Sequence, residues 1–226
     1  MPLLHPSGGL RYHLRAWRWR HTRWQSFHSE VARWLDAWQP PCRHLVLVGP
    51  SGGYALNAHF LAQFQRITVL EPDALACQLL HQRFSDFDFE FADSMWLAKP
   101  DGAAILAKRY PDAALLFCNL LGQTLAGQAT GHDRQAWLGA LQAALQGREW
   151  ASWHDLASTV RRPDRFGQLS LPQAESLDNL LTKFWLGGVL EIHDHECFGM
   201  LPASSRQYAI WQLTPGRFHL VEWLHS

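Results

Sequence analysis

The chain has 226 residues, which is enough for one well-buried domain. Lys plus Arg and Asp plus Glu balance at 20 each, so the net charge gives no argument for a nucleic-acid partner. The sequence contains no apolar run long enough to cross a bilayer, no secretory signal pattern and no C-x-x-C pair among its four cysteines. We therefore expect a cytoplasmic protein without a membrane partner.

Residues 1–41 are expected to form a helical accessory segment. Apolar residues recur at helical spacing from Trp24 to Trp38, and two prolines end the pattern. Before it, five arginines are interleaved with Trp17 and Trp19. This segment either caps a substrate pocket or forms a solvated helix whose tryptophans pack on the core.

From residue 42 onward, strand-like and helix-like patterns alternate. Strands are predicted at 45–48, 67–70, 87–91, 113–118 and 149–153, and helices at 55–64, 74–84 and 133–146. The chain ends in two strand patterns, 207–213 and 218–223, around a tight turn. We expect residues 42–226 to form one α/β domain with a doubly wound, mostly parallel sheet, helices on both faces and a C-terminal antiparallel hairpin.

The first predicted strand runs into a glycine-rich turn, Gly49-Pro50-Ser51-Gly52-Gly53, and the second ends at Glu71. A close backbone turn followed by a carboxylate is the order that a nucleoside-containing cofactor needs, because the acid can accept hydrogen bonds from ribose hydroxyls. The same turn also fits the G-x-S-x-G elbow of a serine esterase of the α/β-hydrolase type, with Ser51 as nucleophile. In that alternative, Asp155 or Asp194 is the acid and the base is one of His193, His195, His219 and His225.

From about Leu45 to the hairpin, the chain resembles the class I S-adenosylmethionine-dependent methyltransferases, a Rossmann-like superfamily. The resemblance implies that Gly49, Ser51 and Gly53 pass under the methionine part of the cofactor, with Ser51 where a glycine is commoner. It implies further that Glu71 binds the ribose hydroxyls. In the family, a polar residue after the third strand contacts the adenine and a segment after the fourth lies beside the transferable methyl; these positions hold Asp93, Ser94 and Asn119.

The resemblance thus implies a methyltransferase that converts S-adenosylmethionine to S-adenosylhomocysteine. Only about 44 residues, without obvious strands, precede the turn, which favours this interpretation over the hydrolase. We expect a small-molecule acceptor and no nucleic acid, and a homo-oligomer is compatible with the sequence. His154, followed by Asp155, is the candidate catalytic base, facing the cofactor from the end of the fifth strand. A further alternative is a non-catalytic methyltransferase-like binding protein.

The cluster His193-Asp194-His195-Glu196 is the other group of residues that suggests chemistry. Adjacent side chains of an extended segment point to opposite faces, so the four cannot all converge on one metal ion. We therefore expect no metal and interpret the cluster as a polar loop that lines the acceptor pocket.

Overall fold

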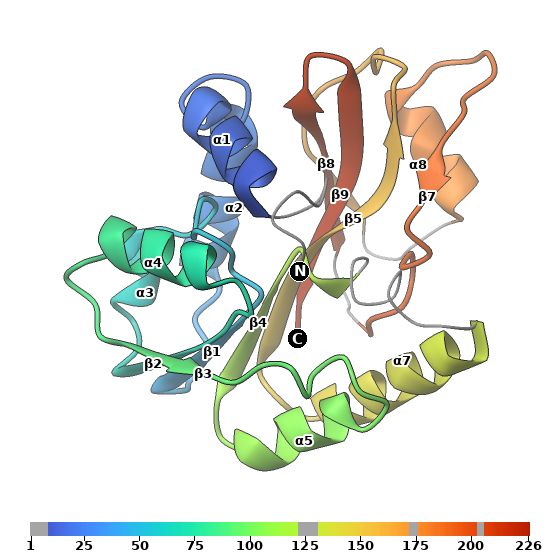
Figure 1. Ribbon diagram of the computed structural model, residues 1–226. Helices are drawn as coiled ribbons and strands as arrows, with labels where there is room; N and C mark the ends of the chain where they lie inside the picture. The colour runs from blue at the N-terminus through green and yellow to red at the C-terminus, as the bar shows by residue number, and fades with distance from the viewer. Residues whose placement is uncertain (1–8, 122–130, 172–175, 203–205) are drawn as a thin grey trace.

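The structure is a computed structural model and describes residues 9–121, 131–171, 176–202 and 206–226. In these residues a nine-stranded sheet carries helices on both faces (Figure 1). The strands are β1 (His44–Val48), β2 (Arg66–Leu70), β3 (Phe89–Ala92), β4 (Ala114–Cys118), β5 (Trp150–Thr159), β6 (Leu169–Leu171), β7 (His193–Asp194), β8 (Arg206–Thr214) and β9 (Arg217–His225). The helices are α1 (Gly9–Trp19), α2 (Gln25–Ala37), α3 (Ala58–Leu61), α4 (Ala74–Arg83), α5 (Gly102–Arg109), α7 (Gly131–Leu145) and α8 (Leu177–Phe184).

The strand order is β3-β2-β1-β4-β5-β9-β8-β6, and β7 pairs with β5. The first five strands in this order are parallel, whereas β9 is antiparallel to both β5 and β8. This confirms the predicted fold class. The chain leaves β1 towards β2 on one side and returns to β4 on the other. Such a reversal opens a crevice at the carboxyl ends of β1 and β4, where ligands of open α/β sheets bind.

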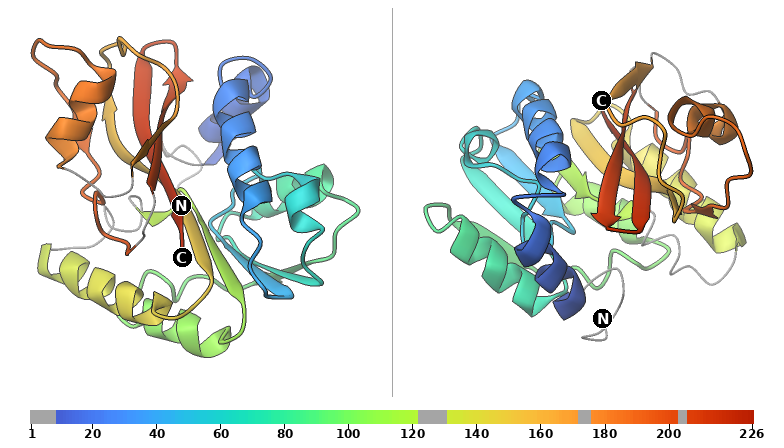
Figure 2. Two further views of the ribbon diagram at one scale, coloured as in Figure 1. Left: turned by 180° about the vertical axis from the view of Figure 1, so that it is seen from behind. Right: turned by 90° about the horizontal axis from the view of Figure 1, so that it is seen from above.

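Both faces of the parallel part are buried, which explains its uninterrupted apolar strands. Val46 and Val48 of β1 pack with α5, α7 and α8, and the alternate residues Leu45 and Leu47 pack with α2, α3 and α4. The helices lie on both sides of the sheet (Figure 2). Among the described residues, none of the helices is both long and apolar enough to pass through a membrane.

The N-terminal helices belong to the same hydrophobic core as the sheet. The ring of Phe27 on α2 stacks on Trp211 of β8, with centroids 5.0 Å apart. On α1, the Nδ1 atom of His13 lies 2.9 Å from the hydroxyl of Tyr54, which follows the glycine-rich turn. Helices α1 and α2 are therefore tied to the body of the protein, and the role of the first 41 residues as a cap over a ligand stays a prediction.

The largest departure from the sequence-based expectation is the length of β5. This strand was expected to end at residue 153 but continues to Thr159, since β9 pairs with it over nearly its whole length. His154 and Asp155 consequently lie within the strand. The helix expected at 55–64 is reduced to α3, which Asn57 caps by accepting from the amide of Phe60. The sequence patterns do not predict α5 or α8.

Replacement of Trp24 tests the docking of the N-terminal segment. Trp24 is fully buried, and its indole Nε1 donates to the carbonyl of Leu213 at 3.1 Å. Trp24→Ala is expected to lower the free energy of unfolding by about 3–5 kcal/mol, measured by urea denaturation. Trp17, at 75% exposure, provides the matched control, and Trp17→Ala should change stability by less than about 0.5 kcal/mol. Equal losses in the two variants would contradict this packing.

Candidate functional site

A cavity of about 390 Å³ lies at the carboxyl ends of β1, β2 and β4. One wall is formed by the turn after β1 and the segment after β2, and the other by β5 and the C-terminal hairpin. Residues of α1 line part of its rim. The polar side chains on which the chemistry of the cavity depends are Ser51, Glu71, Asn119, Asp155, His195 and His219.

Gly49 allows the chain to turn sharply directly after β1. This residue has a positive φ of 65°, and its amide donates to the carbonyl of Leu70 at 2.9 Å. A Cβ atom at Gly49 would lie 2.9 Å from Cδ1 of Leu120, so a side chain would not fit. Ser51 also has a positive φ, 52°, which is uncommon for a residue with a side chain. Both residues line the cavity.

Glu71 is fixed at the end of β2 by two backbone amides. Its Oε2 accepts from the amide of Ser51 at 2.9 Å, and its Oε1 accepts from the amide of Asp73 at 3.1 Å. Burial raises the pKa of the Glu71 carboxyl, and these two hydrogen bonds oppose the rise. Each oxygen keeps a second lone pair, so the carboxylate can accept further hydrogen bonds from a ligand in the cavity.

Three of the other sequence-predicted residues lie away from the cavity lining. A Cβ atom at Gly53 would lie 2.5 Å from Leu80, so this glycine allows α4 to pack against the turn. Asp93 is exposed and accepts from the amide of Met95, and Ser94 is buried beside it. None of Gly53, Asp93 and Ser94 is among the residues that line the cavity. Their roles in cofactor binding stay predictions.

Asn119, directly after β4, is joined to Asp155 of β5 by two hydrogen bonds. The Asn119 amide group donates to Oδ2 of Asp155 at 3.2 Å, and its oxygen accepts from the Asp155 backbone amide at 3.0 Å. Asn119 has a positive φ of 52°, which asparagine tolerates better than most residues. The pair thus joins the end of β4 to β5 within the cavity lining.

Asp155 also lies beside two histidines. Its Oδ2 is 3.0 Å from Nδ1 of His219 on β9, and the nitrogens of His195 and His219 and the Asp155 oxygen lie within 4.8 Å of one another. Burial by itself would raise the pKa of Asp155, but the two histidines and Asn119 hold it below its usual value. Burial lowers the pKa of His195. Sequence reasoning named all three residues for the hydrolase alternative, and His195 also in the His193–Glu196 cluster, but it did not bring the three together because their spacing along the chain gives no sign of this cluster.

His154 lies on the other face of β5 from Asp155, because side chains alternate along a strand. It is 1% exposed, its Nδ1 is 3.0 Å from the hydroxyl of Ser152, and its Nε2 is 3.2 Å from Glu222 of β9. The expectation that His154 faces the cofactor side of the sheet is therefore wrong, for the reason that β5 extends past it. Its role as catalytic base stays a prediction without support from the cavity lining.

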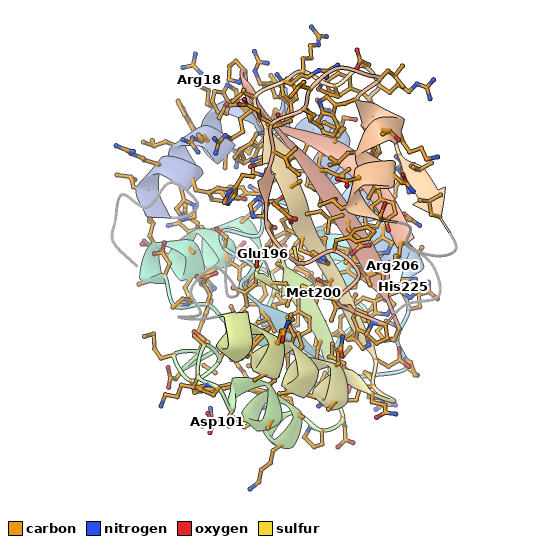
Figure 3. The ribbon with its side chains drawn as sticks, turned by 90° about the vertical axis from the view of Figure 1, so that its right-hand side faces the viewer. Arg18, Asp101, Glu196, Met200, Arg206 and His225 are labelled. Carbon is orange, nitrogen blue, oxygen red and sulfur yellow. The ribbon has the colours of Figure 1, made fainter. Side chains whose placement is uncertain are left out.

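The histidine-rich segment begins at β7 and continues above α7, where Glu196 and Met200 mark it in Figure 3. Gln142 of α7 donates to the carbonyl of Met200 and holds the segment there. His193 and His195 both line the cavity, whereas Asp194 and Glu196 are not among its lining residues. The interpretation of this segment as part of an acceptor pocket stays a prediction.

No family model and no curated protein matches this chain. Solved structures with a similar arrangement include the N-methyltransferase NodS from Bradyrhizobium japonicum, at 10% identity and a TM-score of 0.44, covering 89% of this chain and 95% of NodS. Another is CalS10 from Micromonospora echinaspora, an amino pentose methyltransferase with S-adenosylmethionine bound, at 15% identity and a TM-score of 0.40, covering 97% and 99%.

Removal of the Asp155 carboxylate should destabilise the protein, because it takes the acceptor from the Asn119 amide group and the negative charge from beside His219. Asp155→Ala is expected to lower the free energy of unfolding by about 3 kcal/mol at neutral pH, measured by urea denaturation. The matched control is Asp36, which lies 3.0 Å from His59 in an exposed pair. Asp36→Ala should leave stability nearly unchanged. A comparable loss in both variants would mean that burial does not strengthen the Asp155 interactions.

Proposed function

We propose that the protein is an S-adenosylmethionine-dependent methyltransferase that acts on a small-molecule acceptor. The observation that carries the proposal is Glu71, a carboxylate held by two amides at the rim of the cavity, one strand away from the glycine-rich turn. A carboxylate fixed in this way is suited to a pair of vicinal hydroxyls, as in a ribose.

The rest of this wall fits the other parts of such a cofactor. Gly49 has no side chain, so a ligand in the cavity could approach its backbone closely, and Asn119 follows β4, the strand that pairs with β1. When bound, the cofactor supplies an electrophilic methyl group. The protein residues then have to orient the acceptor and exclude water, because methyl transfer is an in-line displacement that depends on alignment.

The opposite wall is suited to the acceptor. It combines the polar groups of Asp155, His195 and His219 with the rings of Trp153 and Trp211. An enclosed wall with aromatic surface and a few polar groups is typical of a small-molecule site. These features support a small, partly apolar acceptor.

Calorimetric titration with S-adenosylmethionine and S-adenosylhomocysteine tests the cofactor. Glu71→Ala removes hydrogen bonds to a charged acceptor and is expected to weaken both ligands about tenfold to a hundredfold. Glu90→Ala is the matched control. Glu90 lies on the edge strand β3, where it pairs with Arg66 of β2 on the exposed surface, and it does not line the cavity. Failure of the unmodified protein to bind either ligand, or equal binding by Glu71→Ala, would contradict the proposal.

The serine esterase remains the second candidate, since one observation favours it. Ser51 has the positive φ of a strained turn and shares the cavity with the Asp155–His219 pair. Against it, residues 9–43 contain helices α1 and α2 and no strand, so these described residues supply no strand that could carry an oxyanion-hole loop. The esterase interpretation also gives Glu71 no role.

A fluorophosphonate probe separates the two candidates. We expect no labelling of the purified protein, because the proposed role of Ser51 is the donation of its backbone amide to Glu71. Ser51→Ala should accordingly retain S-adenosylmethionine binding within about threefold, since the amide is kept. Labelling of the unmodified protein that is lost in Ser51→Ala would establish the esterase instead.

A further inference from the structure

A second site for a ligand is suggested by the cluster of Asp155, His195 and His219. One residue comes from β5, one from the segment after β7 and one from β9. One ligand atom of each lies within 4.8 Å of the other two. Three possible donors from three separate segments of the chain thus lie close together in the cavity wall.

The polar atoms of this cluster lack sufficient partners within the described part of the chain. Asp155 and His219 are 8% and 6% exposed, yet Oδ1 of Asp155 and both ring nitrogens of His219 have no hydrogen-bond partner there. The same is true of Nε2 of His195. A buried polar atom without a partner costs about 1–3 kcal/mol, so three neighbouring residues that each have such an atom indicate a bound group that satisfies one atom of each.

The contact between Asp155 and His219 also differs from a hydrogen bond. Their Oδ2 and Nδ1 atoms are 3.0 Å apart, but Nδ1 has no hydrogen-bond partner, so the oxygen does not lie along the N–H direction. A dedicated proton-transfer pair would align these atoms. If the Asp155 oxygen and the His219 nitrogen both directed a lone pair at a shared third atom, the two atoms would lie close together without a hydrogen bond between them.

Neighbouring groups fix the three side chains in place. The amide group of Asn119 donates to Oδ2 of Asp155 at 3.2 Å. The backbone amide of His195 donates to the carbonyl of Leu156 at 2.9 Å, and the thiol of Cys197 donates to the carbonyl of Asp155 at 2.9 Å. Supporting hydrogen bonds of this kind orient the ligands of metal sites.

We propose that Asp155, His195 and His219 bind a divalent transition-metal ion of the Zn²⁺ or Fe²⁺ class. Two imidazole nitrogens and one carboxylate oxygen are a donor set that these ions prefer over Mg²⁺ or Ca²⁺. Three protein ligands would leave coordination positions open on the ion, and all three residues line the cavity, from which a further ligand could reach it. The site would therefore take a small ligand with an oxygen or nitrogen donor.

Titration of the untagged, metal-free full chain with Zn²⁺ tests this site. We expect one ion per chain by calorimetry, and Co²⁺ should give the absorption spectrum of a histidine-ligated ion. His195→Ala, which changes a partly exposed residue, should weaken Zn²⁺ binding by at least about tenfold while circular dichroism stays unchanged. His219→Ala should weaken Zn²⁺ binding in the same way. If His219→Ala does not fold, Asp155→Asn, which keeps the size of the side chain, takes its place and should also weaken Zn²⁺ binding.

His59→Ala is the matched control, because His59 also lies 3.0 Å from a carboxylate, that of Asp36, but on the exposed surface. It should bind Zn²⁺ as the unmodified protein does. Absence of stoichiometric binding, unchanged binding by His195→Ala, or an equal loss in His59→Ala would each overturn the metal site.

The proposed metal site and the proposed methyltransferase function can be tested independently of each other. Glu71→Ala should lose affinity for S-adenosylmethionine but keep Zn²⁺ binding, since Glu71 contributes no ligand atom to the cluster. Zn²⁺ binding in a protein that does not bind S-adenosylmethionine would support this inference and contradict the methyltransferase. S-adenosylmethionine binding without Zn²⁺ binding would do the opposite.

Discussion

The two amides that hold Glu71 determine the shape of the cavity edge. The Ser51 amide can reach the carboxylate because Gly49 and Ser51 both have positive φ values, which turn the chain back over the end of β2. For Ser51 this conformation is unfavourable by about 1–2 kcal/mol, and a charge-assisted hydrogen bond offsets it. The contact also requires the parallel register in which Val48 pairs with Leu70, so the cavity edge depends on the sheet.

The pairing of β5 with β9 places two acid–histidine pairs on opposite faces of the sheet. On one face, Glu222 lies between His154 at 3.2 Å and Arg206 at 2.8 Å. Burial would raise the pKa of Glu222, but these two partners hold it below its usual value. On the other face, Asp155 reaches His219 across an irregularity in the register between residues 155 and 157. Such bulges redirect side chains near functional sites.

The predictability of the site differs from residue to residue. Gly49, Ser51, Glu71 and Asn119 could be placed from sequence, since each directly follows an apolar strand and parallel strands end at a common edge. His154 was placed on the wrong face because the apolar pattern stops at residue 153, while hydrogen bonds to β9 carry the strand to Thr159. The extension of a strand by a distant partner leaves no local sequence signal.

The sequence alone determined the five parallel strands, the C-terminal hairpin and the carboxylate beside the glycine-rich turn, because periodicity and turn residues are local properties of the chain. Tertiary structure decided the rest. It alone brings Asp155, His195 and His219 together from positions up to 64 residues apart, and it alone docks the first helices on the hairpin through Phe27 and Trp211. These contacts depend on strand pairing and packing between distant segments, which no local pattern encodes.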